Sequence, residues 1–279
     1  MRAKIVKIVS NDYTVLCNDT YYVCKSRGKF RNMKITPLVG DNVDIDLNTR
    51  CIMEVEPRRN ELVRPYVANI DQVFIIASTK HPDLDLNLLD KLLVLIEFNN
   101  IKPIICFTKL DLLNKEELDN IELIRKYYTN IGYKVFYNIE LDKIKESFKG
   151  KITVFTGQSG AGKSTLLNRL NVNLNLETNE ISDALGRGKH TTRHVELISM
   201  LDGLVADTPG FSSLDLSSMT KSDIKDNFID FNIYRDECKY RDCMHQKEGI
   251  NECVIKQEVE KGNILKSRYD NYIKFIGEK

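Results

Sequence analysis

The chain of 279 residues carries 41 Lys and Arg against 40 Asp and Glu, and 42% of its residues are hydrophobic. This length and composition predict a protein of two or three compact domains. The longest apolar runs are too short to cross a bilayer and the N-terminus lacks a signal-peptide core, so we expect a cytoplasmic protein with no membrane partner. Seven cysteines, three of them within 238–253, indicate one metal site plus core thiols and not a disulfide framework.

Residues 1–62 are predicted to form an all-β barrel. Short β-rich runs alternate with Asn, Asp and Gly turn signals, which is the spacing of a five-stranded OB-like fold. The runs are 4–9, 13–17, 21–24, 42–47 and 51–55.

A basic cluster follows the third of these runs. Its members fall within ten positions that contain no acid, and they are Lys25, Arg27, Lys29, Arg31 and Lys34. Such a cluster can bind a polyanion such as RNA. It can equally be a solvated hairpin edge, where basic side chains discourage edge-to-edge aggregation. Composition does not choose between these interpretations.

Residues 63–215 are predicted to form an α/β nucleotide domain. Apolar strands alternate with segments of helical period, as in a doubly wound fold. The expected strands are 70–77, 103–107, 133–137, 151–156 and 203–207, and the expected helices lie around 86–99, 115–130 and 163–171.

A base-reading element ends the strand at 103–107. The Asp111 carboxylate can accept hydrogen bonds from N1–H and the exocyclic amine of guanine, which adenine cannot match, while the stem of Lys109 lies across the base. The four residues 108–111 can also form a surface turn that caps the next helix, but the apolar strand before them favours a role in reading the base. The predicted GTP contacts here are Thr108, Lys109, Leu110 and Asp111.

A phosphate-binding loop follows the strand at 151–156, and a helix-forming run follows the loop at once. Its glycines let backbone N–H groups close around phosphate oxygens. Lys163 is expected to reach the β- and γ-phosphates, and Ser164 to bind Mg²⁺. The predicted GTP contacts are Gly157, Gln158, Ser159, Gly160, Ala161, Gly162, Lys163, Ser164 and Thr165.

Two switch elements are expected after this loop. The last predicted strand ends in an Asp-x-x-Gly motif, in which Asp207 would hold Mg²⁺ through water and the Gly210 amide would sense the γ-phosphate. The polar stretch 186–194 would supply a threonine to Mg²⁺. We choose Thr192, with Thr191 as the alternative.

The attacking water needs a polar partner. Phe211 follows the Asp-x-x-Gly motif where many GTPases place a glutamine, so intrinsic hydrolysis is expected to be slow. His190 is the predicted catalytic residue, because imidazole can orient or deprotonate water near neutral pH. Its alternative role is a contact to RNA phosphate or solvent.

The order of the motifs is reversed relative to ordinary small GTPases, because the guanine motif at 108–111 precedes the phosphate loop at 157–164. The nucleotide domain is therefore predicted to be circularly permuted. The switch that senses the γ-phosphate then leads directly into the C-terminal segment, so hydrolysis could move that segment.

Residues 216–279 are predicted to form an α-helical zinc-binding module. The pattern C-x4-C-x-H-x7-C suits a closed tetrahedral structural site, with ligands Cys238, Cys243, His245 and Cys253. Cysteines packed as small hydrophobes are the alternative, which their charged neighbours disfavour. A helix is expected over 254–276, with too little apolar content for a large independent core.

The sequence resembles the circularly permuted small ribosomal subunit biogenesis GTPases, the RsgA family, over nearly its whole length. Beyond the motifs, the resemblance includes the linker at 57–65, the segment 68–72 and the pair Arg268-Tyr269. It implies an OB-fold RNA-binding domain, a GTPase domain and a zinc module. It further implies binding to the 30S subunit and its 16S rRNA during late maturation, with subunit-stimulated hydrolysis of GTP to GDP. We expect a monomer that uses Mg²⁺ with GTP and one structural Zn²⁺ per chain.

The chain departs from the family at the guanine motif, where Thr108 stands in place of the usual Asn. We expect guanine selectivity with some loss of loop bracing. The loop at Tyr137 and Asn138 also differs, which affects the contact to the far edge of the base.

Two other functions compete with this interpretation. A P-loop ATPase or kinase is disfavoured by Asp111. An RNA-binding assembly factor with a degenerate nucleotide site is disfavoured because the phosphate and Mg²⁺ residues are all present, namely Lys163, Ser164, Thr192 and Asp207.

Overall fold

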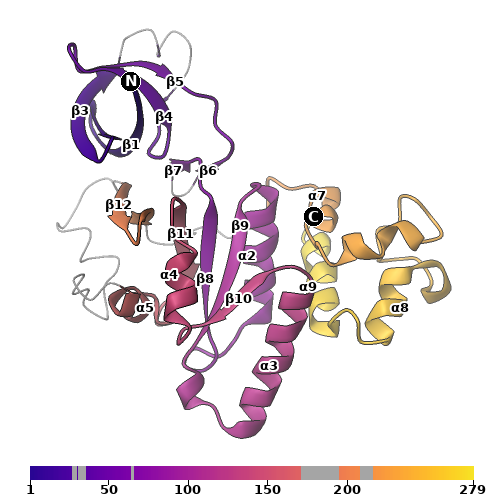
Figure 1. Ribbon diagram of the computed structural model, residues 1–279. Coiled ribbons are helices and arrows are strands. Elements are labelled where there is room, and N and C mark those ends of the chain that lie inside the picture. The colour runs from indigo at the N-terminus through magenta and orange to yellow at the C-terminus, as the bar shows by residue number, and fades with distance from the viewer. Residues whose placement is uncertain (27–29, 31–35, 64–65, 171–194, 208–215) are drawn as a thin grey trace.

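The computed structural model describes residues 1–26, 30, 36–63, 66–170, 195–207 and 216–279 (Figure 1). These residues form an N-terminal barrel, a central α/β domain below it and a C-terminal helical module at one side of the central domain. Within these ranges no helix is both long and apolar enough to cross a membrane.

The N-terminal barrel closes in the strand order β1-β2-β3-β5-β4, with β4 returning to β1. The strands are β1 (Arg2–Val9), β2 (Asp12–Cys17), β3 (Thr20–Ser26), β4 (Asn42–Asp46) and β5 (Cys51–Val55). One side chain of each strand at the barrel centre is fully buried, and these are Ile5, Val15, Cys24, Val43 and Ile52. The predicted five-stranded barrel is confirmed.

The central domain is built on a sheet in the order β10-β9-β8-β11-β13-β12. The strands are β8 (Gln72–Ser78), β9 (Lys102–Thr108), β10 (Lys134–Tyr137), β11 (Ile152–Gly157), β12 (Glu196–Met200) and β13 (Gly203–Asp207). All neighbours are parallel except β12 and β13. The carboxyl ends of the parallel strands therefore meet at one edge, where open α/β sheets bind ligands.

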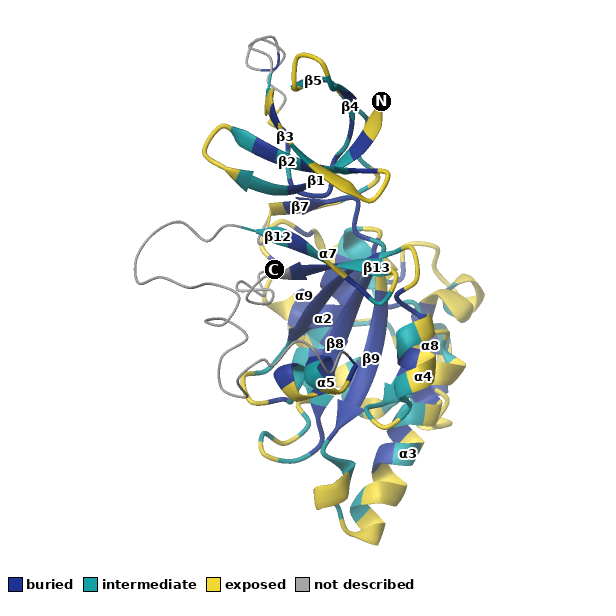
Figure 2. Ribbon diagram, turned by 60° about the vertical axis from the view of Figure 1, so that its left-hand side comes forward, coloured by how far each residue is buried: buried dark blue, intermediate teal, exposed yellow. Residues whose placement is uncertain are grey.

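Helices cover both faces of this sheet. One face carries α2 (Leu86–Phe98) and α3 (Lys115–Asn130), and the other carries α4 (Leu141–Glu146) and α5 (Lys163–Leu170). Side chains of β8 alternate between the two cores: Val73 and Ile75 pack under α2 and α3, whereas Phe74 and Ile76 pack under α4 and α5. A strand buried on both faces needs a continuous apolar run, and Figure 2 shows β8 and β9 as buried strands.

Side-chain caps fix where the helices beside the nucleotide motifs begin. The Asp85 carboxylate accepts from the backbone N–H groups of Asn87 and Leu88 before α2. Asn114 and Glu117 form a reciprocal capping box at the start of α3, directly after the guanine motif.

The C-terminal module contains short helices and 3-10 turns. They are α7 (Lys221–Asp226), η2 (Phe231–Ile233), η3 (Arg235–Glu237), η4 (Ile250–Glu252), α8 (Val254–Glu260) and α9 (Lys266–Gly277). The single helix predicted over 254–276 is wrong. The chain turns at Gly262, whose φ of +80° suits glycine after a helix, and is extended at Leu265 before α9 begins.

The module has an apolar core that continues into the central domain. Phe228, Phe231 and Tyr272 are fully buried, and they belong to one cluster with Val94 and Leu95 of α2. The core of the module is therefore not independent, as the apolar content of the segment predicted, because α2 contributes to it. The shared core fixes the module to α2.

A buried ionic cluster adds to this contact. The Arg268 guanidinium on α9 is fully buried and donates to Asp90 of α2 at 2.6 Å, and its Nε lies 3.0 Å from both carboxylate oxygens of Asp230. Tyr128 donates to Asp90 and Tyr127 to Asp230, each at 2.7 Å. Every carboxylate in the cluster thus faces a cation and a hydroxyl, which burial of charge requires.

The linker joins the barrel to the central domain through β6 (Glu61–Val63) and β7 (Tyr66–Ala68), which form a hairpin. The Arg58 guanidinium contacts both oxygens of the buried Asp41 at 2.7 and 2.9 Å and pairs with Glu61 at 2.6 Å. Such a bidentate pair fixes geometry as well as charge.

A second connection runs through β12, the edge strand that the sequence analysis did not predict. Lys7 of β1 pairs with Glu196 of β12 in the sheet, and their side chains form an ion pair at 2.7 Å. The hydroxyls of Tyr21 and Ser199 lie 2.9 Å apart. The barrel and the central sheet are therefore joined edge to edge.

Candidate nucleotide site and metal centre

The phosphate loop connects the end of β11 to the start of α5, as the sequence predicted. Gly157 has φ +140°, and a Cβ there would lie 2.2 Å from the Ile76 carbonyl oxygen, so no other residue fits beside β8. Gly160 and Gly162 also have positive φ, at +73° and +94°. The glycines are thus required by the path of the loop as well as by its expected ligand.

Lys163 folds back over this loop. Its Nζ donates to the carbonyl oxygens of Gly157 and Gln158 at 2.8 and 2.9 Å, and burial lowers the pKa of its ammonium. Ser164, the next residue of α5, is buried at 8% exposure. The ammonium lies within the loop that is expected to enclose phosphate oxygens.

The guanine motif lies beside the phosphate loop. Thr108 ends β9 in register with Ser78 of β8. Its buried hydroxyl donates to the carbonyl oxygen of Ala161 at 2.6 Å, and its side chain lies about 4 Å or less from the position of a Cβ at Gly162. The threonine hydroxyl thus makes a direct bond from the motif to the loop, and the expected loss of bracing relative to asparagine stays a prediction.

The motif then turns sharply. Lys109 has left-handed φ and ψ of 61° and 32°, and η1 (Leu110–Leu112) follows. This turn leaves Asp111 exposed at the edge of the sheet where the strands end. The Lys109 ammonium donates to the carbonyl oxygen of His81.

The segment after β8 contacts both motifs, although the sequence analysis did not select it. Pro82 is the nearest side chain to a Cβ at Gly160, at 4.0 Å, and the His81 carbonyl holds Lys109. The Thr79 hydroxyl donates to the Thr108 carbonyl. Strand order would have indicated this segment, because β8 lies between β9 and β11.

The loop after β10 is tied to the same region. The Asn138 backbone N–H donates to the Phe107 carbonyl at 2.9 Å. The Tyr137 hydroxyl donates to Glu122 at 2.5 Å, and the Arg125 guanidinium lies over its ring at 4.3 Å. The departure from the family pattern thus lies in an ordered loop next to the guanine motif.

Several predicted residues of the switches lie outside the described residues. They are His190, Thr191, Thr192, Gly210 and Phe211. Asp207, in contrast, is described and ends β13, where its backbone pairs with Glu196. Of the basic cluster, Lys25 is described and forms an exposed ion pair with Asp12 at 2.5 Å, while Arg27, Lys29, Arg31 and Lys34 lie outside the described ranges.

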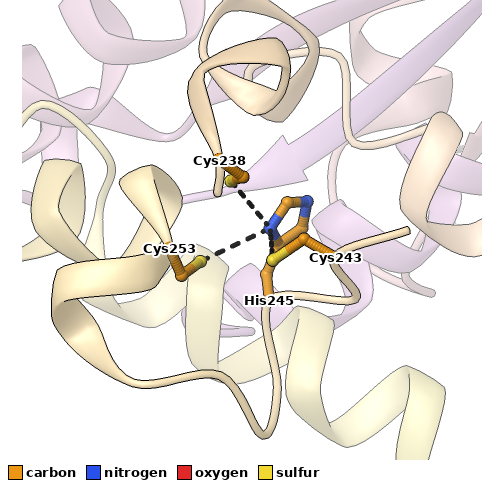
Figure 3. Close-up of side chains that lie close together, drawn as sticks. All are labelled: Cys238, Cys243, His245 and Cys253. Carbon is orange, nitrogen blue, oxygen red and sulfur yellow. Dashed lines mark hydrogen bonds between the residues drawn. The ribbon is translucent and has the colours of Figure 1, made fainter. Parts of the chain in front are cut away.

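The predicted metal ligands meet in the C-terminal module (Figure 3). The three sulfurs of Cys238, Cys243 and Cys253 lie 3.7, 3.3 and 3.4 Å from Nδ1 of His245. All four ligand atoms lie within 4.8 Å of one another. Tetrahedral zinc, with bonds of about 2.3 Å to sulfur and about 2.0 Å to nitrogen, places sulfur and nitrogen ligands about 3.5 Å apart. The three distances from sulfur to Nδ1 agree with this separation.

The electrostatics of the cluster also fit a dication. Burial lowers the pKa of His245 to about 4, so its imidazole is neutral near pH 7 and can ligate a metal. Burial raises the pKa values of the Cys243 and Cys253 thiols. Buried thiolates therefore need a nearby cation, and Zn²⁺ would supply it.

Known proteins match the chain over its length. The family model described as RsgA GTPase matches residues 55–217, and the one described as RsgA N-terminal domain matches residues 3–51. The small ribosomal subunit biogenesis GTPase RsgA 2 of Oceanobacillus iheyensis is 49% identical, over 99% of this chain and 96% of its own length. The chain belongs to the RsgA family. RsgA of Bacillus subtilis is 46% identical, also over 99% of this chain and 96% of its own length.

Two solved structures share the fold. The crystal structure of YloQ, a circularly permuted GTPase, has a TM-score of 0.84 and 40% identity, covering 99% of this chain and 94% of that one. YjeQ from Thermotoga maritima has a TM-score of 0.85 and 33% identity, covering 99% and 97%. This RsgA-family chain is a GTP hydrolase with a circularly permuted nucleotide domain, so the predicted permutation is confirmed and the ATPase or kinase alternative is set aside.

Proposed function

We propose that this RsgA-family GTPase binds the small ribosomal subunit and its 16S rRNA, assists late maturation of the subunit, and hydrolyses GTP faster when bound to it. Relatives that are 46–49% identical over 99% of the chain are named small ribosomal subunit biogenesis GTPases. The structural observation that supports the nucleotide part of the proposal is the bond from Thr108 to Ala161, which joins the permuted guanine motif and the phosphate loop at one sheet edge.

The phosphate end of the site is proposed to work through Lys163 and the backbone N–H groups of the loop. The ammonium would leave the loop carbonyls and contact the β- and γ-phosphates. Ser164, Thr192 and Asp207 would hold Mg²⁺. When bound, that ion neutralises charge on the β- and γ-phosphate oxygens. At the other end, Asp111 would accept from guanine while the stem of Lys109 covers the base.

Each of the three parts of the chain has its own proposed role. We propose an RNA-binding barrel over 1–62, the GTPase domain over 63–215 and a zinc module over 216–279. The basic residues within 25–34 would contact rRNA phosphates, so subunit association should weaken as salt rises.

The catalytic water is proposed to be oriented by His190. The His190→Ala variant should bind GTP and pellet with purified small subunits as the unmodified chain does, but lose most subunit-stimulated turnover. Reversing Lys25, Arg27, Lys29 and Arg31 to acids is the matched comparison, because it should weaken pelleting and leave GTP affinity unchanged. Stimulated turnover that survives in His190→Ala with binding intact would assign the water to another group.

Zinc in the C-terminal module is proposed to be structural. Freshly purified protein should contain about one zinc per chain by elemental analysis, because the Cys3His donor set is closed and preassembled. Cys243→Ala should lose zinc partly or wholly and make residues after 215 sensitive to protease, because zinc binding is coupled to folding. The matched control is Cys17→Ala in the barrel core, which also removes a buried thiol and should keep the zinc. Absence of zinc from the unmodified protein would contradict the assignment.

A further inference from the structure

A second threonine lies behind the guanine motif. Thr79 directly follows β8 and is 8% exposed. Its hydroxyl lies 2.9 Å from the Thr108 carbonyl oxygen and 3.2 Å from that of Lys109, and its backbone N–H donates to the Thr108 carbonyl at 3.2 Å. One hydroxyl is therefore shared between the carbonyls of two successive residues of the motif.

The turn at Lys109 needs such a support. A left-handed backbone is disfavoured for a residue that carries a Cβ, so the turn must be held by its surroundings. The Lys109 carbonyl also accepts the N–H of Leu112 at 3.1 Å, which closes the 3-10 turn that carries Asp111. A group that fixes the Lys109 carbonyl therefore fixes the position of the Asp111 carboxylate.

The two threonine hydroxyls make consecutive hydrogen bonds that are linked through Thr108. Thr79 holds the Thr108 carbonyl, and the Thr108 hydroxyl holds the Ala161 carbonyl at 2.6 Å. All three residues are buried, so an unmade bond would not be replaced by water at no cost. The chain of bonds runs from β8 through the guanine motif to the phosphate loop.

We infer that Thr79 is a positioning residue for guanine selectivity, which acts through the backbone of the guanine motif on Asp111. The inference rests on the proposed role of Asp111 as the reader of guanine. A carboxylate in register with the base accepts from both N1–H and the 2-amine. A displaced carboxylate loses the contact with the 2-amine, which is the group that distinguishes guanine from hypoxanthine.

The test is competition of GDP and of the hypoxanthine nucleotide IDP for the full chain. Thr79→Val keeps the side-chain shape and the backbone N–H but removes the hydroxyl. It should weaken GDP by about tenfold and lower the ratio of GDP to IDP affinity by a similar factor. Thr79→Ser restores the hydroxyl and should stay within about twofold of the unmodified chain.

A matched control removes another buried hydroxyl from the same domain. Thr153 is fully buried near the start of β11, and its oxygen accepts from the Gln72 amide at 2.9 Å. Thr153→Val should leave the ratio of GDP to IDP affinity unchanged. If Thr79→Val leaves the ratio of GDP to IDP affinity unchanged, whether both affinities stay the same or both fall equally, the inference is overturned and Thr79 has a purely structural role.

Asp111→Asn separates this outcome from failure of the site itself. An amide cannot accept from both guanine groups as the carboxylate does, so GDP affinity should fall by more than tenfold. If Asp111→Asn binds GDP normally, the proposed guanine site is wrong and the role of Thr79 falls with it. If Asp111→Asn loses GDP affinity while Thr79→Val keeps the ratio of GDP to IDP affinity of the unmodified chain, only the inference about Thr79 is overturned.

Discussion

Replacing Lys163 with alanine is expected to lower GTP turnover by at least about 100-fold, the size of effect seen when one preorganised charge-stabilising group is removed from an active site. The ammonium lies between the Gly157 and Gln158 carbonyls at 2.8 and 2.9 Å, inside the loop that would enclose the phosphates. Negative charge shifts among the phosphate oxygens during transfer, and a cation within the loop stabilises it directly.

The control for Lys163→Ala is Lys149→Ala. Lys149 is an exposed lysine between α4 and β11, at the end of the strand away from the loop. Its removal should leave turnover unchanged in a phosphate-release assay, both alone and with small subunits. Turnover retained within about threefold in Lys163→Ala, against the large loss expected from this chemistry, would mean that the phosphates bind elsewhere.

Arg268→Met should cost about 3–5 kcal/mol in the free energy of unfolding, because it leaves two buried carboxylates without their cation. Arg268, Asp90 and Asp230 are each at most 1% exposed, so water cannot replace the lost partner. Adding Asp90→Asn and Asp230→Asn should recover part of the loss, since the buried charges are then removed together. Urea titration followed by near- and far-UV circular dichroism measures the effect.

The same helix supplies the control for this variant. Lys266 forms an exposed ion pair with Asp270 at 2.9 Å, with 78% of the lysine side chain accessible. Lys266→Met should change stability too little to resolve, because exposed pairs are screened by water. If Arg268→Met costs no more than Lys266→Met, the buried cluster does not tie α9 to α2. The shared apolar core would then be what holds the module on α2.

The sequence was most informative where function demands contiguous residues. The phosphate loop, the guanine motif and the cysteine spacing each predicted a local geometry, and the strands around them alternate with helices as periodicity required. The predicted metal ligands meet because turns of the module bring four nearby positions together. Local chemistry and local structure agree at these sites.

The features that the sequence did not predict depend on distant contacts. Strand β12 is an edge strand that gains its second neighbour only from the barrel, through Lys7 and Glu196. The break between α8 and α9 is the exception, because the chain turns locally at Gly262 within a helical period that continues on both sides. Thr79 is remote from the guanine motif in the chain and meets it only because β8 and β9 are adjacent.

The bond that Thr108 makes to the phosphate loop also depends on tertiary structure. A threonine is shorter than the asparagine usual in the family, so some loss of bracing was expected. The close approach of the motif to Ala161, at 2.6 Å, allows the shorter side chain to make the bond. The distance between two loops is a tertiary property that a motif does not encode.

The most direct test of the proposed function is steady-state GTP turnover by the unmodified chain, measured with and without purified small ribosomal subunits. We expect slow turnover by the chain alone, because the Phe211 side chain cannot orient water, and a clear rise when small subunits are added. Large subunits at the same concentration should give no rise. GTP turnover that is the same with small subunits, with large subunits and with neither would contradict the proposed function.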